Sequence, residues 1–169
     1  MIRLLGAVLI AFGAAWLGLS AAAELGRKVR RLEHLSIGLS LLERELWERG
    51  SPLPQVLEEL ARRTEEPAKA LFAQSAAACG RLDQEPFPAA WRRLVQEAEG
   101  LTAEGRAALL PLGEVLGRYE AQEQREAIAQ ARSALERERE RAEGEKLRMG
   151  RVYQALGVSG GAFLVILLL

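Results

Sequence analysis

The sequence predicts an all-α protein: a helical bundle of about six helices with a transmembrane helix at each end. Three observations predict this fold class. All 23 Asp and Glu, and 22 of the 23 Lys and Arg, lie between Glu24 and Arg151, so both ends are apolar. No stretch between those two residues alternates apolar and polar side chains as a strand does. Alanine, leucine, glutamate and arginine, which favour helices, dominate the same region.

Both apolar ends are predicted to cross a membrane. Residues 4–23 form a run of 20 positions without a formal charge, and about 20 apolar residues are needed to cross the hydrocarbon core as a helix. Residues 152–169 form a second uncharged run of 18 positions, a shorter span that local bilayer thinning can accommodate. Residues 24–151 are then one folded domain, a cytoplasmic helical bundle.

Basic residues border both apolar segments on the side of the middle domain. They are Arg27, Lys28, Arg30 and Arg31 after the first segment, and Lys146, Arg148 and Arg151 before the second. Because basic residues beside a membrane helix resist translocation, this pattern predicts a hairpin with the domain in the cytoplasm and both termini outside. An alternative remains open. Ala21–Ala23 resembles a signal-peptide cleavage site, and cleavage there would leave an exported helical protein with a C-terminal membrane anchor.

Apolar spacing and helix-breaking residues divide the first part of the domain. The first membrane helix is expected to continue to Arg49, and Gly50 to end it. One stripe at heptad spacing indicates a buried face on this helix: Leu32, Leu35, Leu39, Leu42 and Leu46, widened by Ile37 and Leu41. Ser51 is then expected to cap a second helix that starts at Pro52.

Further prolines and a threonine mark the helices that follow. Pro67 opens a third helix, and Pro86 and Pro88 precede a fourth whose core face includes Trp91 and Leu94. Thr102 can cap a fifth helix with Leu109, Leu112 and Leu116 on its apolar side, which Pro111 should kink or shorten.

In the last part of the domain, the sequence predicts one long, largely polar helix from about Tyr119 to Met149, which leads into the second apolar segment. Its apolar seam recurs every seven residues: Ala121, Ile128, Leu135, Ala142 and Met149. Residues 136–141 alternate glutamate and arginine, which is typical of a solvated helix face and less often of a docking surface.

The composition excludes several classes of chemistry. The middle region has a net charge of −1, without the basic face that nucleic-acid binding requires. One cysteine, Cys79, and one histidine, His34, cannot form a disulfide or a His/Cys metal cluster, and are expected to be a buried filler and a solvated or interfacial side chain. No phosphate-binding loop or catalytic motif is present. We therefore predict a non-enzymatic protein without catalytic residues, cofactor or metal. A membrane-bound hydrolase would have to use a glutamate pair such as Glu43 and Glu45, in a pocket that shifts their pKa values.

Residues 42–53, Leu-Glu-Arg-Glu-Leu-Trp-Glu-Arg-Gly-Ser-Pro-Leu, carry a family resemblance. The string resembles one in the stage III sporulation protein AB family, which shows leucine, Glu-x-Glu, an aromatic residue and Thr/Ser-Pro-Leu; Trp47 and Ser51 are variants of it. Leu4–Ala7, the basic stretch after the first segment, Leu112–Gly117 and the apolar tail extend the similarity over nearly the whole chain.

The resemblance implies a bundle similar to the cytoplasmic domains of the type II secretion platform protein F family. It also implies residence in the mother-cell membrane around the forespore, within a secretion-like channel complex. The implied partners are the sporulation ATPase of that complex and other stage III sporulation channel proteins. In this interpretation Glu43 and Glu45 are candidate partner contacts, unless they are solvated or paired locally. Gly113 and Gly117 would allow close helix packing, and the glycine-rich first span and the thin seam permit a homo-oligomer.

Overall fold

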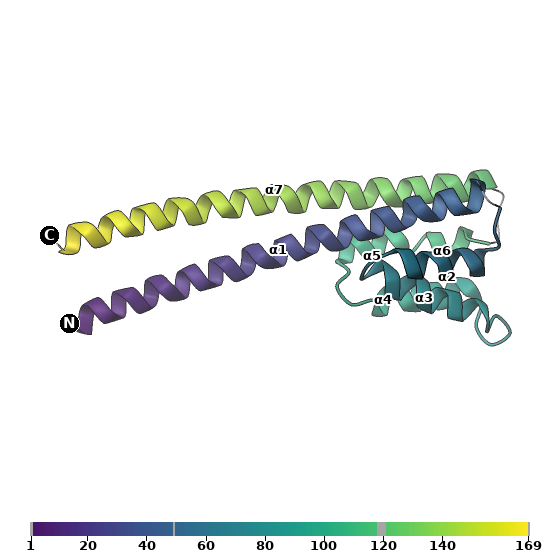
Figure 1. Ribbon diagram of the computed structural model, residues 1–169, viewed down its shortest axis with the longest axis horizontal. Helices are drawn as coiled ribbons and strands as arrows, with labels where there is room; N and C mark the ends of the chain where they lie inside the picture. Colours follow the sequence, from purple (N-terminus) through teal and green to yellow (C-terminus); the bar gives the residue numbers. More distant parts are fainter. Residues whose placement is uncertain (1, 49, 118–120, 169) are drawn as a thin grey trace. The chain divides into compact units, whose positions relative to one another are not determined.

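α1 extends unbroken from Ile2 to Glu48 in the computed structural model of the protein (Figure 1). The structure describes the backbone of residues 2–48, 50–117 and 121–168; within these ranges, the side chains of residues 2–15, 17–19, 21–22, 121, 153–158 and 160–168 are not described. The predicted continuation of the first helix into the middle domain is confirmed. Gly50 follows with a φ of 60°, a left-handed conformation that glycine adopts readily and that cannot extend the helix.

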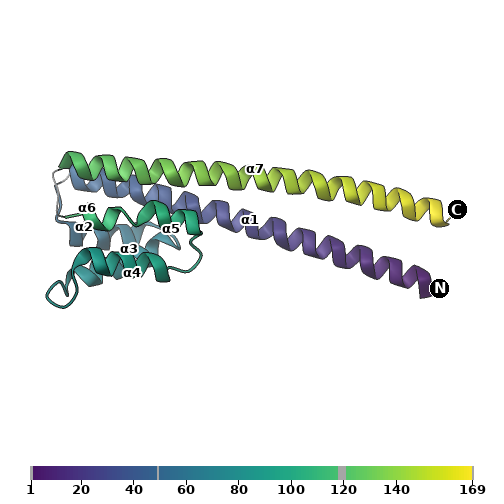
Figure 2. The same ribbon diagram turned by 180° about the vertical axis from the view of Figure 1, so that it is seen from behind.

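Shorter helices follow along the chain, and the described residues form helices, turns and connections without a strand, which confirms the all-α prediction. Figure 2 shows the same helices from behind. They are α2 (Leu53–Arg63), α3 (Ala68–Cys79), α4 (Phe87–Glu97), α5 (Ala103–Leu109) and α6 (Leu112–Val115).

Prolines and a threonine begin these helices mostly where the sequence predicted. Pro67 and Pro86 precede α3 and α4, and the Thr102 side chain accepts a hydrogen bond of 3.0 Å from the Gly105 amide. Ser51 was predicted to cap α2, and this is wrong: Pro52 occupies the capping position and its carbonyl oxygen accepts from the Val56 amide at 3.1 Å. The helical hydrogen bonds therefore begin at the Pro52 carbonyl, one residue later than predicted, and Pro54 lies in the first turn, where backbone amides have no helical partner.

The core of the short helices forms around Trp91. Its side chain is fully buried, and its Nε1 donates a hydrogen bond of 2.8 Å to the Leu109 carbonyl oxygen, which joins α4 to α5. Pro111 separates α5 from α6, as predicted. The prediction for Gly113 is confirmed, because a Cβ there would lie 2.5 Å from Trp91 Cδ1. At Gly117 the reason for glycine is the backbone rather than the space: its φ is 78°, a left-handed conformation that other residues rarely adopt.

The leucine stripe of α1 is buried against these helices and against α7. Leu32, Leu35, Leu39 and Leu42 are each at most 2% exposed, and Leu46 packs at the margin of the core. Ile37 was expected to widen this stripe, and it is 48% exposed instead. Two residues correspond to a rotation of about 200° around a helix, which turns Ile37 away from the buried face of Leu35.

α7 extends from Ala121 to Leu168. Ile128, Leu135 and Ala142 of the predicted seam are fully buried, whereas Met149 is 38% exposed; the side chain of Ala121 lies outside the described residues. The run 136–141 was expected to be solvated, and Glu138 contradicts this because it is only 6% exposed. The reason is its position. Glu138 lies three residues after Leu135 and four before Ala142, which is the intervening core position of the same heptad pattern.

The chain separates into two compact units. One consists of residues Met1–Arg27 and Arg141–Leu169, and the other of residues Lys28–Glu140. Over the residues that the structure describes, no helix combines the length and apolar character needed to cross a membrane. Most side chains of the two segments predicted to span it, 4–23 and 152–169, lie outside the described residues, so both spans stay a prediction.

Candidate interaction surface

Glu45, one of the two candidate partner contacts, lies between α1 and α2. Its side chain is 8% exposed and its Oε1 accepts a hydrogen bond of 2.9 Å from Nη1 of Arg63, near the end of α2. Glu45 also lines a cavity of about 300 Å³ together with Glu58 and Glu59 of α2. Glu58 is exposed, and Glu59 accepts from Arg62 at 2.8 Å. Three carboxylates and the guanidinium group of Arg62 line this opening, so its lining has a net charge of −2, which favours a cationic side chain as the group that enters it.

Glu43 lies on the other side of α1 and contacts α7. Its Oε2 accepts a hydrogen bond of 2.8 Å from Nη1 of Arg132, and the Glu43 side chain stays 31% exposed. Two residues along a helix correspond to about 200° of rotation, so Glu43 and Glu45 face different neighbouring helices. The structure brings each of them to an arginine and does not bring them to each other. A hydrolase that uses this glutamate pair has no support in this geometry.

Trp47, the aromatic residue of the family-like string, contacts α7 as well. The guanidinium carbon of Arg125 lies 5.2 Å from the centre of the Trp47 ring, a cation–π contact at the end of α1. Residue numbers on α7 decrease as those on α1 increase, since Glu43 pairs with Arg132 and Trp47 with Arg125. The two helices are therefore antiparallel within this unit, as Figures 1 and 2 both show.

Lys28 was predicted as part of a basic membrane flank, and the structure gives it a second role. Its Nζ lies 2.7 Å from Oε1 of Glu138, with side-chain exposures of 25% and 7%. Lys28 continues the 3-4 spacing of the leucine stripe, because it lies four residues before Leu32. A charged residue thus occupies a core position on each helix, and the two pair with each other. Sequence reasoning missed Glu138, although its place between Leu135 and Ala142 could have revealed it.

The remaining basic flank residues differ in their surroundings. Arg27 donates to Glu24 at 2.9 Å, and Arg31 packs beside Gly100, where a Cβ would lie 2.8 Å from Arg31 Nε. Three others are exposed on α7, where they alternate with the exposed apolar side chains Leu147, Met149 and Val152: Lys146, Arg148 and Arg151. Arg30 is exposed on α1.

Hydrogen bonds from arginines shift the pKa values of two surface carboxyls. Arg139 holds the pKa of Glu136 below its usual range, and Arg93 does the same for Glu85. Burial raises the pKa of the Cys79 thiol, which makes it a poorer nucleophile. Neither effect produces the raised carboxyl pKa that a general acid requires at neutral pH.

The lone histidine was expected to be solvated or interfacial; its side chain is half-buried and hydrogen-bonded. His34 Nδ1 donates to the Glu66 carbonyl oxygen at 3.0 Å, and its Nε2 lies 3.5 Å from Glu65 Oε2. These contacts tie α1 to the connection between α2 and α3. Among the described residues, no group of three or more His, Cys, Asp or Glu side chains could hold a metal ion.

These features define a class of protein: an all-α bundle in which ion pairs such as Glu45–Arg63, Glu43–Arg132 and Lys28–Glu138 join one helix to another. The chain belongs to the stage III sporulation protein AB family, whose model matches residues 3–169. It is therefore a sporulation protein, as the string at residues 42–53 indicated.

The chain is also similar to two known proteins. The stage III sporulation protein AB of Bacillus subtilis strain 168 is 27% identical over 174 residues, which covers 100% of both chains. A solved structure of stage III sporulation protein AB superposes with a TM-score of 0.64 at 22% identity, and covers 72% of this chain and 98% of that chain. At that identity the structural similarity confirms the helical fold and nothing further.

Proposed function

We propose that this protein is a non-enzymatic platform component of a sporulation channel complex in the mother-cell membrane. Its domain holds the cytoplasmic sporulation ATPase of that complex and couples it to the transmembrane part. The observation that carries this proposal is the continuity of two helices. α1 begins at Ile2, within the first apolar segment, and ends at Glu48; α7 begins at Ala121 and ends at Leu168. Two helices of the domain, α1 and α7, thus continue into the predicted spans.

The polar contacts of the domain also suit a load-carrying part better than a catalytic one. Ion pairs join α1 to α2 through Glu45 and Arg63, and α1 to α7 through Glu43 and Arg132. The acidic opening lined by Glu45, Glu58 and Glu59 provides a surface for a basic partner. Family membership and the basic residues beside both apolar segments support the placement of this surface in the cytoplasm.

The first test is the side of the membrane on which the domain lies. Arg137 is exposed on α7, and Cys79 is the single native cysteine, so a single cysteine at position 137 can be placed in a Cys79→Ser background. A membrane-impermeant maleimide should label this cysteine only after the cells are lysed. Labelling in intact cells would instead place the domain outside, as the cleaved-signal alternative requires, and N-terminal sequencing from Glu24 would then identify that form.

The second test is capture of the ATPase by the full-length protein in detergent. Glu58→Arg reverses a charge at the acidic opening without removing an ion pair of the domain, so it should lower capture at least about tenfold. Glu104→Arg, an exposed charge reversal on α5, is the matched control and should leave capture unchanged. Equal capture by both variants would remove the acidic opening from the proposal. No capture by the wild-type protein would contradict the platform function itself.

A further inference from the structure

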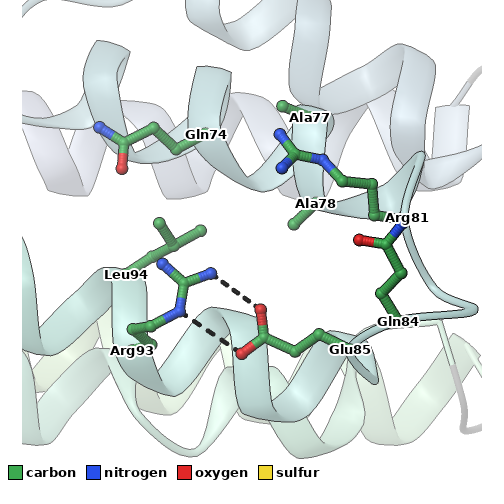
Figure 3. Close-up of a pocket in the computed structure, with 8 residues that line it drawn as sticks. All are labelled: Gln74, Ala77, Ala78, Arg81, Gln84, Glu85, Arg93 and Leu94. Atoms are coloured by element: carbon green, nitrogen blue, oxygen red, sulfur yellow. Dashed lines mark hydrogen bonds and ion pairs between the residues drawn. The ribbon is translucent and has the colours of Figure 1, made fainter.

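One groove runs between α3 and α4, on a face of the domain that the proposed function does not use. It consists of two adjoining cavities of about 680 Å³ and 260 Å³, which share Gln74 and Leu94 as lining residues. The larger cavity lies at the start of α3 beside Pro67, and the smaller at its end beside Arg81. Figure 3 shows the smaller one, with Gln74 on α3 facing Leu94 on α4.

The α3 side of this groove has small side chains that leave its backbone accessible to another helix. Among its lining residues, Ala77 is exposed, and Ala70 and Ala78 are half-buried along the same helix. Two helices approach more closely where the side chains between them are small, so a helix can pack here without repacking of the domain. Leu71 and Phe72 of α3 are buried in the core, so Gln74 is the one long side chain that α3 exposes between Lys69 and Arg81 among the described residues.

The two ends of the groove carry opposite charge. At the Arg81 end, two guanidinium groups face one carboxylate: Arg93 donates to Glu85 at 2.8 Å, whereas Arg81 has no ion pair among the described residues (Figure 3). At the other end, three carboxylates face one guanidinium group, and they belong to Glu66, Glu97 and Glu99, opposite Arg31. Glu97 Oε2 also lies 3.5 Å from Nη1 of Arg93, whereas Glu66 and Glu99 have no ion pair among the described residues. The sign of the charge therefore reverses along the groove, with Gln74 near the middle.

We infer that this groove is an interface between two copies of the chain, related by a two-fold axis that passes near Gln74. A two-fold axis at the middle of the groove brings each end of one copy against the opposite end of the other. Arg81 of each copy then meets Glu97 and Glu99 of its partner, and the two α3 helices cross over their alanine faces. The charge order of the groove is thus complementary to itself, which identifies a second copy as the occupant.

Cysteine cross-linking in the full-length protein tests the position of the axis. A residue near a two-fold axis lies close to its own copy, so Gln74→Cys in a Cys79→Ser background should form a disulfide-linked dimer on mild oxidation in membranes. Gln130→Cys, which is exposed on α7, is the matched control. We expect at least about tenfold more dimer from position 74 than from position 130. Equal yields at the two positions would contradict the arrangement.

A charge exchange tests the pairing, with the mass of the detergent-solubilised full chain measured by light scattering. Arg81→Glu places like charges together twice in each dimer and should weaken association at least about tenfold. Glu97→Arg with Glu99→Arg should do the same, and the three changes combined in one chain should restore the dimer. Arg137→Glu is the control for net charge. A wild-type monomer at all concentrations, or a dimer that the combined changes fail to restore, would overturn the inference.

Discussion

The two halves of α7 have similar polar compositions and opposite surroundings. From Ile128 to Ala142, every third or fourth side chain is at most 6% exposed, including the charged Glu138. From Glu145 to Val152 every side chain is exposed, including the large apolar residues Leu147 at 64% and Val152 at 47%. A glutamate is thus buried in one half while leucine and valine are exposed in the other. Heptad position alone does not explain the difference, because Met149 continues the seam and is 38% exposed; a side chain of α7 is buried where its heptad position faces the core of the domain.

The largest expected effect comes from truncating a buried side chain in the first half of α7. Leu135→Ala should lower the free energy of unfolding by about 2–5 kcal/mol, because the residue is fully buried and the cavity would remain. Leu147→Ala removes the same atoms from an exposed site and should change the free energy of unfolding by less than about 0.5 kcal/mol. Denaturant unfolding followed by circular dichroism measures both. Similar losses at the two positions would mean that the second half is also packed in solution.

The charged core pair gives the next largest effect. Glu138→Gln removes the ion pair between the partly buried Lys28 ammonium and Glu138, and should cost about 1–3 kcal/mol in the same unfolding assay. Glu140→Gln, at an exposed position two residues later, should cost less than about 0.5 kcal/mol. Lys28→Met combined with Glu138→Leu should recover most of the loss, since an apolar pair fits a core position. If the double variant were less stable than Glu138→Gln, the pair would contribute more than charge compensation.

The smallest expected effect is a gain in stability rather than a loss. A Cβ at Gly144 would meet no atom within 4 Å, so Gly144→Ala should raise helix stability by about 0.5–1 kcal/mol. The same substitution at Gly113 should destabilise the fold, because the added carbon would lie 2.5 Å from Trp91. Melting temperatures of the two variants provide the measurement. A lower melting temperature for Gly144→Ala would indicate that this part of α7 is covered by a neighbour.

Sequence reasoning predicted the parts of this fold that depend on local chemistry. Gly50 ends α1, Thr102 caps α5 and Pro111 separates α5 from α6, because each acts through its own backbone or a neighbour three residues away. The leucine stripe of α1 was also correct, since its spacing alone defines a face.

The candidate site depended on contacts between distant residues, which the sequence does not show. Glu43 and Glu45 have almost the same neighbours in sequence, yet one pairs with Arg132, 89 residues away, and the other with Arg63. The partner of Lys28 lies in a run of alternating charges that reads as a solvated surface. The prediction that Ser51 caps α2 was wrong for a local reason, because two closely spaced prolines, Pro52 and Pro54, both suit the start of a helix.

The pair between Lys28 and Glu138 has a mechanical consequence. If α1 slid along α7 by one helical turn, about 5.4 Å, both charges would face apolar side chains of the seam, which is costly. Axial sliding is therefore resisted by electrostatics as well as by packing. A force along the axis of α1 or α7 within the domain would therefore act on both helices. The two helices would move together rather than independently.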